Sequence, residues 1–169
     1  TEYEITENNY QNTIAQRICD MGVDVIVGGH PHVVQPVELL TSVEDPDHKT
    51  VCIYSLGNAI SNQRISEMRL KTGHTEDGAL FSVTFEKDPI SGVTSITAVD
   101  VVPTWVALDS RNGKLEYNIL PLVDADRESW KELFNLDDKT FGQCEASYDR
   151  TMDIVGPGLE DVNAWLASE

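Results

Sequence analysis

Two histidines separated by one proline carry the strongest chemical signal in this chain. His30 and His32 follow an apolar run, residues 23–27, and a Gly-Gly pair. The run has the composition of a buried strand, so both histidines are expected just past the carboxyl end of a strand, where open α/β sheets bind ligands. Imidazole is a preferred ligand for zinc, manganese and iron-type metals. The spacing therefore predicts a metal site, against the alternative of a polar loop with two ordinary histidines.

Pro31 is expected to make this pair rigid. A proline restricts the residue before it to extended backbone. Side chains at i and i+2 of an extended segment point to the same side. Both rings should therefore face one solvent-accessible cleft, and the two glycines should supply the sharp turn that leads into it.

A second predicted strand also ends in residues that suit a site loop. Residues 50–54 have a β-rich pattern and run directly into Ser55 and Asn58. Small and amide-bearing residues at that position are typical of a loop that lines a site, and we expect Asn58 to lie beside the cleft. An ordinary glycine turn, with Asn58 bonded to its own backbone, is an equally good interpretation.

Hydrophobic spacing predicts the elements that position these residues. Three further strands should form an antiparallel meander, whose last hairpin carries an Asn112-Gly113 turn signal. The predicted strands are 23–27, 37–42, 50–54, 79–86, 93–102 and 115–120. The predicted helices are 7–21, a short one from 126 or 129, 137–154 and 159–166, the last two separated by a Gly-Pro-Gly breaker at 156–158.

Composition limits the function classes. The chain has 169 residues, 40% of them hydrophobic, which suits a globular domain with a real core. The net charge of −17 excludes nucleic acid as a partner and repels polyanions unless cations intervene. No run approaches the ~20 apolar residues that span a bilayer. The three cysteines form no Cys-x-x-Cys pair and are expected to be buried free thiols.

Few basic residues balance this acidity, and several lie in one polar segment, residues 62–77. They are Arg64, Arg69, Lys71 and His74. The segment is expected to be a loop or short helix near the site. Its cations could contact an anion or simply balance the acidic surface.

Several stretches of the chain resemble bacterial capsule-synthesis proteins of the CapA type, the poly-γ-glutamate capsule family. In chain order they are Val23-Asp-Val-Ile-Val-Gly-Gly-His-Pro-His-Val-Val-Gln35, Tyr54-Ser-Leu-Gly-Asn58, Ser61-Asn-Gln-Arg64, Glu76-Asp-Gly-Ala-Leu80 and Pro103-Thr-Trp105. The resemblance covers about residues 2–122, and the stretch 61–64 has the form found in Firmicutes.

The resemblance implies a fold similar to the calcineurin-like metallophosphoesterases, a four-layer α/β/β/α sandwich that holds two metals. We therefore expect an α/β fold in which this chain is the C-terminal half of such a sandwich, with mainly antiparallel strands. Residues 1–123 would form that part of the sandwich, and residues 124–169 a helical extension.

The resemblance also implies roles for the site residues. His30 would bind one metal and His32 the other, the ions being Mn, Zn or Fe. Two metals ~3.5–4 Å apart can clamp a phosphoryl centre and activate water. Ser55 and Asn58 match a family motif and are placed in the catalytic group, without a defined chemical step.

The chain also departs from the family. Members carry an Asp-bearing strand end, a Gly-Asp turn, an Asn-Asn-His segment and a His-Trp-Gly upstream of a Glu-Tyr pair, and here Glu2 and Tyr3 stand at the start. Where the family often has Phe after Ser-Leu-Gly-Asn, this chain has Ala59. Two imidazoles are too few ligands for a tight two-metal site. We therefore expect a piece of a longer protein that binds metal weakly, is inactive alone and self-associates through an exposed sheet edge.

Two functions fit these residues. One is a metal-dependent, phosphoesterase-like hydrolase or transferase acting on phosphate or on an amide polymer. The other is a non-catalytic component that holds or exports poly-γ-glutamate or a similar polymer. For both, the family implies the same partners, which are an anionic surface polymer or its precursor and capsule-synthesis membrane proteins. It also implies a location at the cell surface or the extracellular face of the membrane.

Overall fold

The chain folds into two three-stranded sheets and three α-helices, seen in a computed structural model that describes residues 2–69, 71–110 and 113–168. The first sheet has the strand order β1-β3-β2. Its strands are β1 (Val25–Val27), β2 (Val37–Thr41) and β3 (Lys49–Ile53). β1 runs parallel to β3, and β2 is antiparallel to β3 across the loop 42–48.

The second sheet is the predicted antiparallel meander, in the order β4-β5-β6. Its strands are β4 (Asp77–Lys87), β5 (Thr94–Asp109) and β6 (Glu116–Pro121). β5 runs well past the predicted end at residue 102, because Pro103 and Trp105 continue the pairing with β4 and Trp105 also pairs with β6. Of the predicted Asn112-Gly113 turn, Asn112 lies outside the described residues, and Gly113 has a positive φ of 72°.

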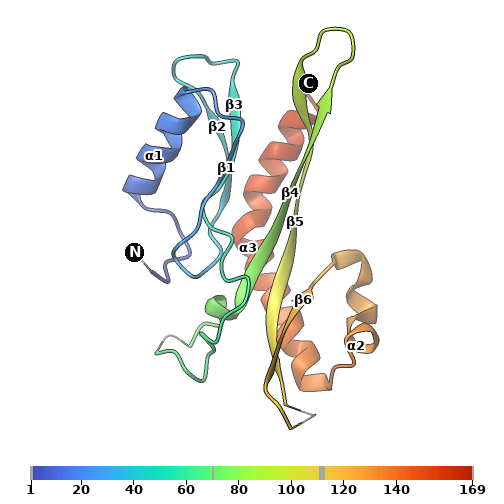
Figure 1. The fold of residues 1–169 in the computed structure, drawn as a ribbon. Coiled ribbons are helices and arrows are strands. Elements are labelled where there is room, and N and C mark those ends of the chain that lie inside the picture. Colours follow the sequence, from blue (N-terminus) through green and yellow to red (C-terminus); the bar gives the residue numbers. More distant parts are fainter. Residues whose placement is uncertain (1, 70, 111–112, 169) are drawn as a thin grey trace.

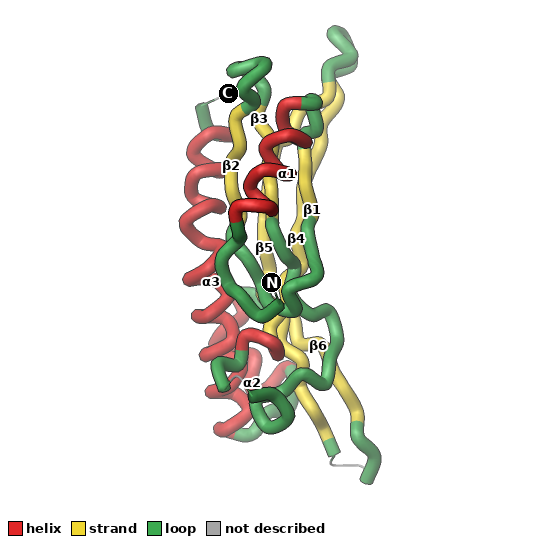
Figure 2. Tube along the Cα trace, turned by 90° about the vertical axis from the view of Figure 1, so that its left-hand side faces the viewer, coloured by secondary structure: helices red, strands yellow, loops and turns green. Residues whose placement is uncertain are grey.

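Helix α1 (Asn9–Asp20) covers the outer face of the first sheet (Figures 1 and 2). It begins two residues later than predicted, because Asn8 is the N-cap and forms a capping box with Gln11. Its buried residues Ala15 and Cys19 pack on Cys52 and Tyr54. This small core contains two of the three cysteines, all of which are free and buried, as expected.

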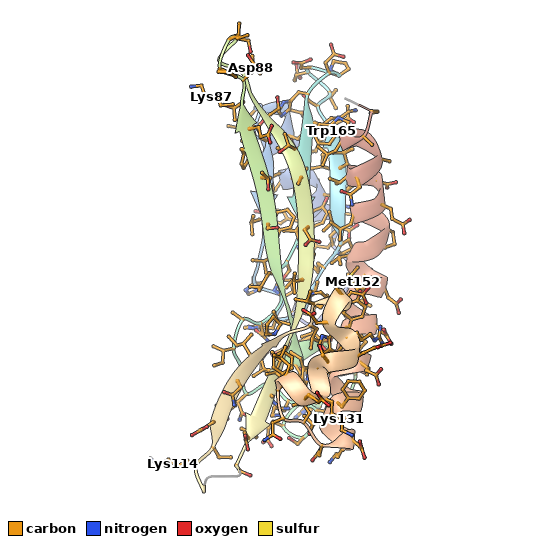
Figure 3. The ribbon with its side chains drawn as sticks, turned by 90° about the vertical axis from the view of Figure 1, so that its right-hand side faces the viewer. Lys87, Asp88, Lys114, Lys131, Met152 and Trp165 are labelled. Atoms are coloured by element: carbon orange, nitrogen blue, oxygen red, sulfur yellow. The ribbon has the colours of Figure 1, made fainter. Side chains whose placement is uncertain are left out.

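The two sheets stack on one another, and α3 (Asp138–Leu166) fills one side of the stack, next to β2 and β5 (Figure 2). The main core contains residues of both sheets and of this helix. Figure 3 shows Met152 and Trp165 on α3, and both pack against that core. A second core lies around Trp105 and Trp130, where the short segments η2 (Asp124–Ser129) and α2 (Trp130–Leu133) cover β5 and β6.

The predicted break at residues 156–158 is wrong, because α3 is one helix of 29 residues that contains Pro157. Proline removes one helical hydrogen bond. The neighbouring Val155 and Leu159 are buried in the main core, and this packing outweighs the loss. Gly158 is needed for close packing, since a Cβ there would lie 1.8 Å from the carbonyl oxygen of Val37 in β2.

The observed architecture is a mixed α/β fold with mainly antiparallel strands and a C-terminal helix, as predicted. The division into residues 1–123 and 124–169 stays a prediction. Within the described residues, no helix is long and apolar enough to cross a membrane.

Candidate functional site

The predicted site residues lie at one edge of the first sheet. β1 and β3 are parallel neighbours, so their carboxyl ends meet there. The chain then leaves β1 through residues 28–32, here called the His-Pro-His loop, and leaves β3 through residues 54–58. Gly28 was expected to supply a sharp turn, but its role is to let these two segments pack closely. A Cβ at Gly28 would lie 2.1 Å from the carbonyl oxygen of Tyr54.

The His-Pro-His loop has an unusual backbone. His30 has a φ of 99° and His32 a φ of 62°, both in the left-handed region that residues other than glycine rarely adopt. The prediction that Pro31 holds His30 in extended backbone is therefore wrong. Backbone strain of this kind costs on the order of 1–3 kcal/mol per residue and persists where the surroundings enforce it, often at functional sites.

The two rings nevertheless lie side by side. The ring centroids of His30 and His32 are 6.4 Å apart, with an angle of 43° between the ring planes. His30 is exposed, and His32 is half-buried. The ring of Tyr3 stacks on that of His32, with the two centroids 6.0 Å apart and an interplanar angle of 26°. Rings this close can donate to one cation or to two neighbouring cations; a cleft around them stays a prediction.

Asn58 lies beside His32, as the strand-end argument predicted. Its side chain is buried, 8% exposed, and its Oδ1 lies 3.0 Å from Nδ1 of His32. Its Nδ2 donates to the carbonyl oxygens of His32 and Thr75 and to Oε1 of Gln63, each at 3.0 Å. The amide therefore ties the His-Pro-His loop to the segment 63–75.

Ser55 is not part of this group. It is fully buried, and its Oγ accepts a hydrogen bond from the backbone N–H of Gly57 at 3.2 Å. Its carbonyl oxygen accepts from the backbone N–H of Gln35. These contacts shape the turn that carries Asn58, and the catalytic role given to Ser55 stays a prediction.

Sequence reasoning gave no role to three residues that complete the site, which are Tyr3, Gln35 and Gln63. Tyr3, itself at a positive φ of 68°, donates its backbone N–H to Pro31 and receives a 3.4 Å hydrogen bond at its hydroxyl from Gln63. Gln35 is 1% exposed, and its Nε2 donates to two carbonyl oxygens in the segment 4–6. Gln35 thereby anchors the segment next to Tyr3. Gln35 and Gln63 lie in stretches that resemble the family, and Tyr3 belongs to the Glu-Tyr pair, which was their one signal in the sequence.

The remaining family-like stretches meet behind Asn58. Trp105 Nε1 donates to Glu76 Oε2 at 3.1 Å, and both side chains are buried. A Cβ on Gly78 would lie 2.5 Å from the carbonyl oxygen of Asn58, so only glycine fits there. Arg64 donates to the carbonyl oxygen of Val106 at 2.7 Å and lies 3.6 Å from Glu76. Arg64 therefore serves this scaffold, not a bound anion.

A buried charged group, here called the Asp77 cluster, anchors this scaffold to α3. It consists of Asp77, Arg150, Ser147 and His74. Arg150 makes two hydrogen bonds to the Asp77 carboxylate, at 2.7 and 2.9 Å, and Ser147 makes one at 2.6 Å. Burial raises the pKa of Asp77, opposed by its bonds to Arg150. Burial also lowers the pKa of His74, which lies 4.0 Å from Asp77.

A cavity of about 650 Å³ lies elsewhere, between β5, β6 and the segment 134–140. Its lining includes Asp109, Glu116 and Phe134 but none of the predicted site residues. The His-Pro-His loop is the better candidate site, because it combines ligand-type side chains with strained backbone.

The His-Pro-His loop fits a divalent metal in part. Two imidazoles are suitable donors for Mn, Zn or Fe, and the Asn58 contact leaves the far nitrogen of His32 open. Within the described part of the chain, no group of three or more His, Cys, Asp or Glu side chains is placed to hold a metal ion. The loop thus offers two nitrogen donors, and the bridging oxygen donors of a two-metal site would have to be added to them.

A stack of two sheets with two neighbouring histidines after a strand end defines a mixed α/β protein with a candidate metal site. Residues 1–63 match the family described as bacterial capsule synthesis protein PGA_cap. The chain is also 33% identical over 116 residues to the PGA biosynthesis protein CapA of Bacillus subtilis (strain 168). The chain belongs to this family of bacterial capsule synthesis proteins.

The match to the Bacillus subtilis protein covers 67% of this chain and 27% of the relative. The chain therefore spans about a quarter of the length of the curated relative that it matches. No solved structure matches the chain.

Proposed function

We propose that this chain contributes the His30 and His32 ligands to a divalent-metal site of a capsule-biosynthesis protein. The observation that carries the proposal is the pair of neighbouring rings, 6.4 Å apart, held on left-handed backbone at the meeting point of two strand ends. Asn58 and Tyr3 restrain His32 from two sides. Strained backbone around two ligand-type side chains costs the folded chain stability. That the fold keeps this strain supports a functional role for the loop.

The whole protein, in this proposal, is a metal-dependent hydrolase or transferase that resembles the dinuclear phosphoesterases. A bound Mn, Zn or Fe ion would polarise a phosphoryl or carbonyl oxygen and activate water. The residues of this chain would orient the donor nitrogens, while Asn58 keeps the loop in place. This chain alone is expected to be inactive, because it supplies two donors rather than the full ligand set.

Calorimetry tests the metal site directly. Titration of the chain with Mn²⁺ or Zn²⁺ should show weak binding that His30→Ala and His32→Ala each abolish. His48→Ala is the matched control, because His48 lies in the β2–β3 loop with its Nε2 near the carbonyl oxygen of Val23. Binding that survives both ring deletions would overturn the proposal. Submicromolar affinity would contradict the expected weakness of a two-donor site.

A second candidate function uses the same residues without chemistry. The net charge of −17 disfavours direct contact with an anionic polymer, and a cation held by two imidazoles could bridge the two. The protein would then hold poly-γ-glutamate or its precursor at the cell surface, together with the membrane proteins of capsule synthesis.

Turnover separates the two functions. Phosphodiester and polyglutamate substrates would be offered to a chain that also carries the family's Asp, Gly-Asp and Asn-Asn-His segments, with His30→Ala and His32→Ala as controls. Turnover lost in both variants favours the enzyme. Metal-dependent binding of the polymer without turnover favours the holding function.

The proposal also keeps the expectation of self-association. β1 pairs with β3 on one side, and Val27 at its end is 54% exposed. An open strand edge with apolar side chains favours pairing with a second copy. Sedimentation velocity should show concentration-dependent dimers, which Val27→Lys should weaken; a monomer at all concentrations would exclude this.

A further inference from the structure

We propose that Asn58 is a positioning residue that holds the neutral ring of His32 in the tautomer protonated at Nδ1, so that Nε2 carries the free electron pair. The contact that carries this inference is the 3.0 Å approach of Asn58 Oδ1 to His32 Nδ1. Which of the two atoms donates follows from the rest of the Asn58 environment.

The orientation of the Asn58 amide is determined by backbone carbonyls. Its Nδ2 lies 3.0 Å from the carbonyl oxygens of His32 and Thr75. A backbone carbonyl can only accept a hydrogen bond, so the group facing both must be the donor NH₂. A flipped amide would place an oxygen against two oxygens inside a buried site. Oδ1 of Asn58 is therefore the atom that faces the ring.

The protonation of His32 follows from this orientation. An amide oxygen can only accept, so Nδ1 of His32 must be the donor in the observed contact. In the neutral ring one nitrogen carries the proton and the other the electron pair. With the proton at Nδ1, the pair is at Nε2, the form required of an Nε2 metal ligand or proton acceptor.

The surroundings keep Asn58 from turning away. Its backbone N–H donates to the carbonyl oxygen of Asp77 at 3.2 Å, and its own carbonyl oxygen lies so close to Gly78 that a Cβ there would come within 2.5 Å of it. The stacked ring of Tyr3 restrains the plane of His32. Buried contacts therefore hold the acceptor Asn58 in place, and the ring of Tyr3 holds the donor His32 in place.

The importance of this tautomer for a cation rests on the proposed function, but the tautomer itself does not. A free histidine side chain in water favours the opposite form, with the proton at Nε2. The ring is thus expected to be prepared in the less common form before any ligand arrives. A hydrogen bond that exists in only one form shifts the ratio of the two by roughly tenfold.

Long-range ¹H–¹⁵N correlation spectra of the whole ¹⁵N-labelled chain, without metal, read the tautomer directly. They would be recorded at about pH 8.5, well above the ordinary histidine pKa of ~6.5. His32 should show a protonated Nδ1 and an unprotonated Nε2. The four histidines can be assigned by replacing each in turn. A wild-type spectrum with the proton at Nε2 of His32 would overturn the proposal, even if no variant folds.

Two variants separate positioning from structural support. Asn58→Ala removes the acceptor for His32 and the NH₂ donor, and Asn58→Asp removes the donor while keeping an acceptor oxygen. Asn58→Ala should move the tautomer ratio roughly tenfold toward Nε2–H, and Asn58→Asp should leave Nδ1 protonated. Equal changes in the two variants would mean that Asn58 only supports the fold.

Tyr3→Leu is the matched control for the second restraint. It removes the stacked ring without touching Asn58, so the tautomer should be unchanged. Metal calorimetry on the same samples distinguishes the two proposals. An Nδ1-protonated His32 in a chain that binds no metal would preserve this inference and defeat the proposed function, and the reverse result would do the opposite.

Discussion

The His-Pro-His loop and the Asp77 cluster are both groups of polar side chains, yet they are built in opposite ways. The loop has exposed or half-buried rings on left-handed backbone. The cluster has a carboxylate 1% exposed that receives three side-chain hydrogen bonds. Strain with open donor atoms indicates a site, whereas burial with complete pairing indicates a scaffold.

The two regions are linked through Asn58. Its backbone contacts Asp77, and its side chain contacts His32. The cluster therefore fixes the position of the loop from behind, through residues that lie 70 and more positions apart in the sequence. If this division of roles is right, mutations in the cluster should reduce stability, and mutations in the loop should reduce ligand binding alone.

The largest expected effect is that of Arg150→Met. It leaves the Asp77 carboxylate buried without its bidentate partner, and breaking a buried pair in this way costs about 3–5 kcal/mol. Because Arg150 is 24% exposed, we expect a loss near 3 kcal/mol in the free energy of unfolding, by urea denaturation. Lys131→Met is the control: Lys131 lies at the surface (Figure 3), paired with the exposed Asp138, and should change nothing measurable. Equal effects would erase the distinction between scaffold and surface.

The next effect tests the link itself. Gly78→Ala would place a Cβ 2.5 Å from the carbonyl oxygen of Asn58 and 2.8 Å from Oγ1 of Thr104. The expected loss in the free energy of unfolding is about 1–3 kcal/mol, with a shift of the His32 ring signals in NMR spectra. Gly142→Ala is the matched control, because it lies in α3 with nothing near its Cβ and should stabilise the helix by about 0.5–1 kcal/mol. Unmoved His32 signals in Gly78→Ala would break the proposed link.

The sequence allowed the prediction of the site's centre because His32 and Asn58 each follow a predicted strand directly. The reason that they meet is the parallel pairing of β1 with β3, which only the structure shows. Tyr3 and Gln63 could not be found in this way. Their positions depend on contacts 60 positions apart in the chain, which local patterns do not contain.

The errors have the same origin. Gly-Pro-Gly normally ends a helix, and α3 continues because Val155 and Leu159 are buried on either side of Pro157. Pro31 normally extends the residue before it, and His30 instead has a φ of 99°. In both places tertiary contacts override a local preference. The meander was easier to predict, because alternation along adjacent strands requires only local information.

A smaller effect, of opposite sign, should be found in the loop. His30→Gly relieves the left-handed strain and should raise the free energy of unfolding by about 1 kcal/mol, while metal binding falls. His30→Ala removes the ring but keeps the strained backbone, so binding should fall with little change in stability. Denaturation and calorimetry on the same two variants provide the measurement. A loss of stability in His30→Gly would mean that His30 supports the fold, and the contrast between the two regions would fail.

The smallest effect concerns pH and the His74 side of the cluster. Burial lowers the pKa of His74 below its ordinary value of 6.5, opposed by Asp77 and reinforced by Arg150. The unfolded chain therefore binds a proton at this position at higher pH than the folded chain does, so the contribution of His74 to stability is present above pH 6.5 and is lost as the pH falls toward its folded value. His74→Asn should flatten the decline in the free energy of unfolding between about pH 7 and 5. An unaltered slope in His74→Asn would mean that the cluster tolerates a second cation beside Arg150. The contrast between a fully paired cluster and an open loop would then be weaker.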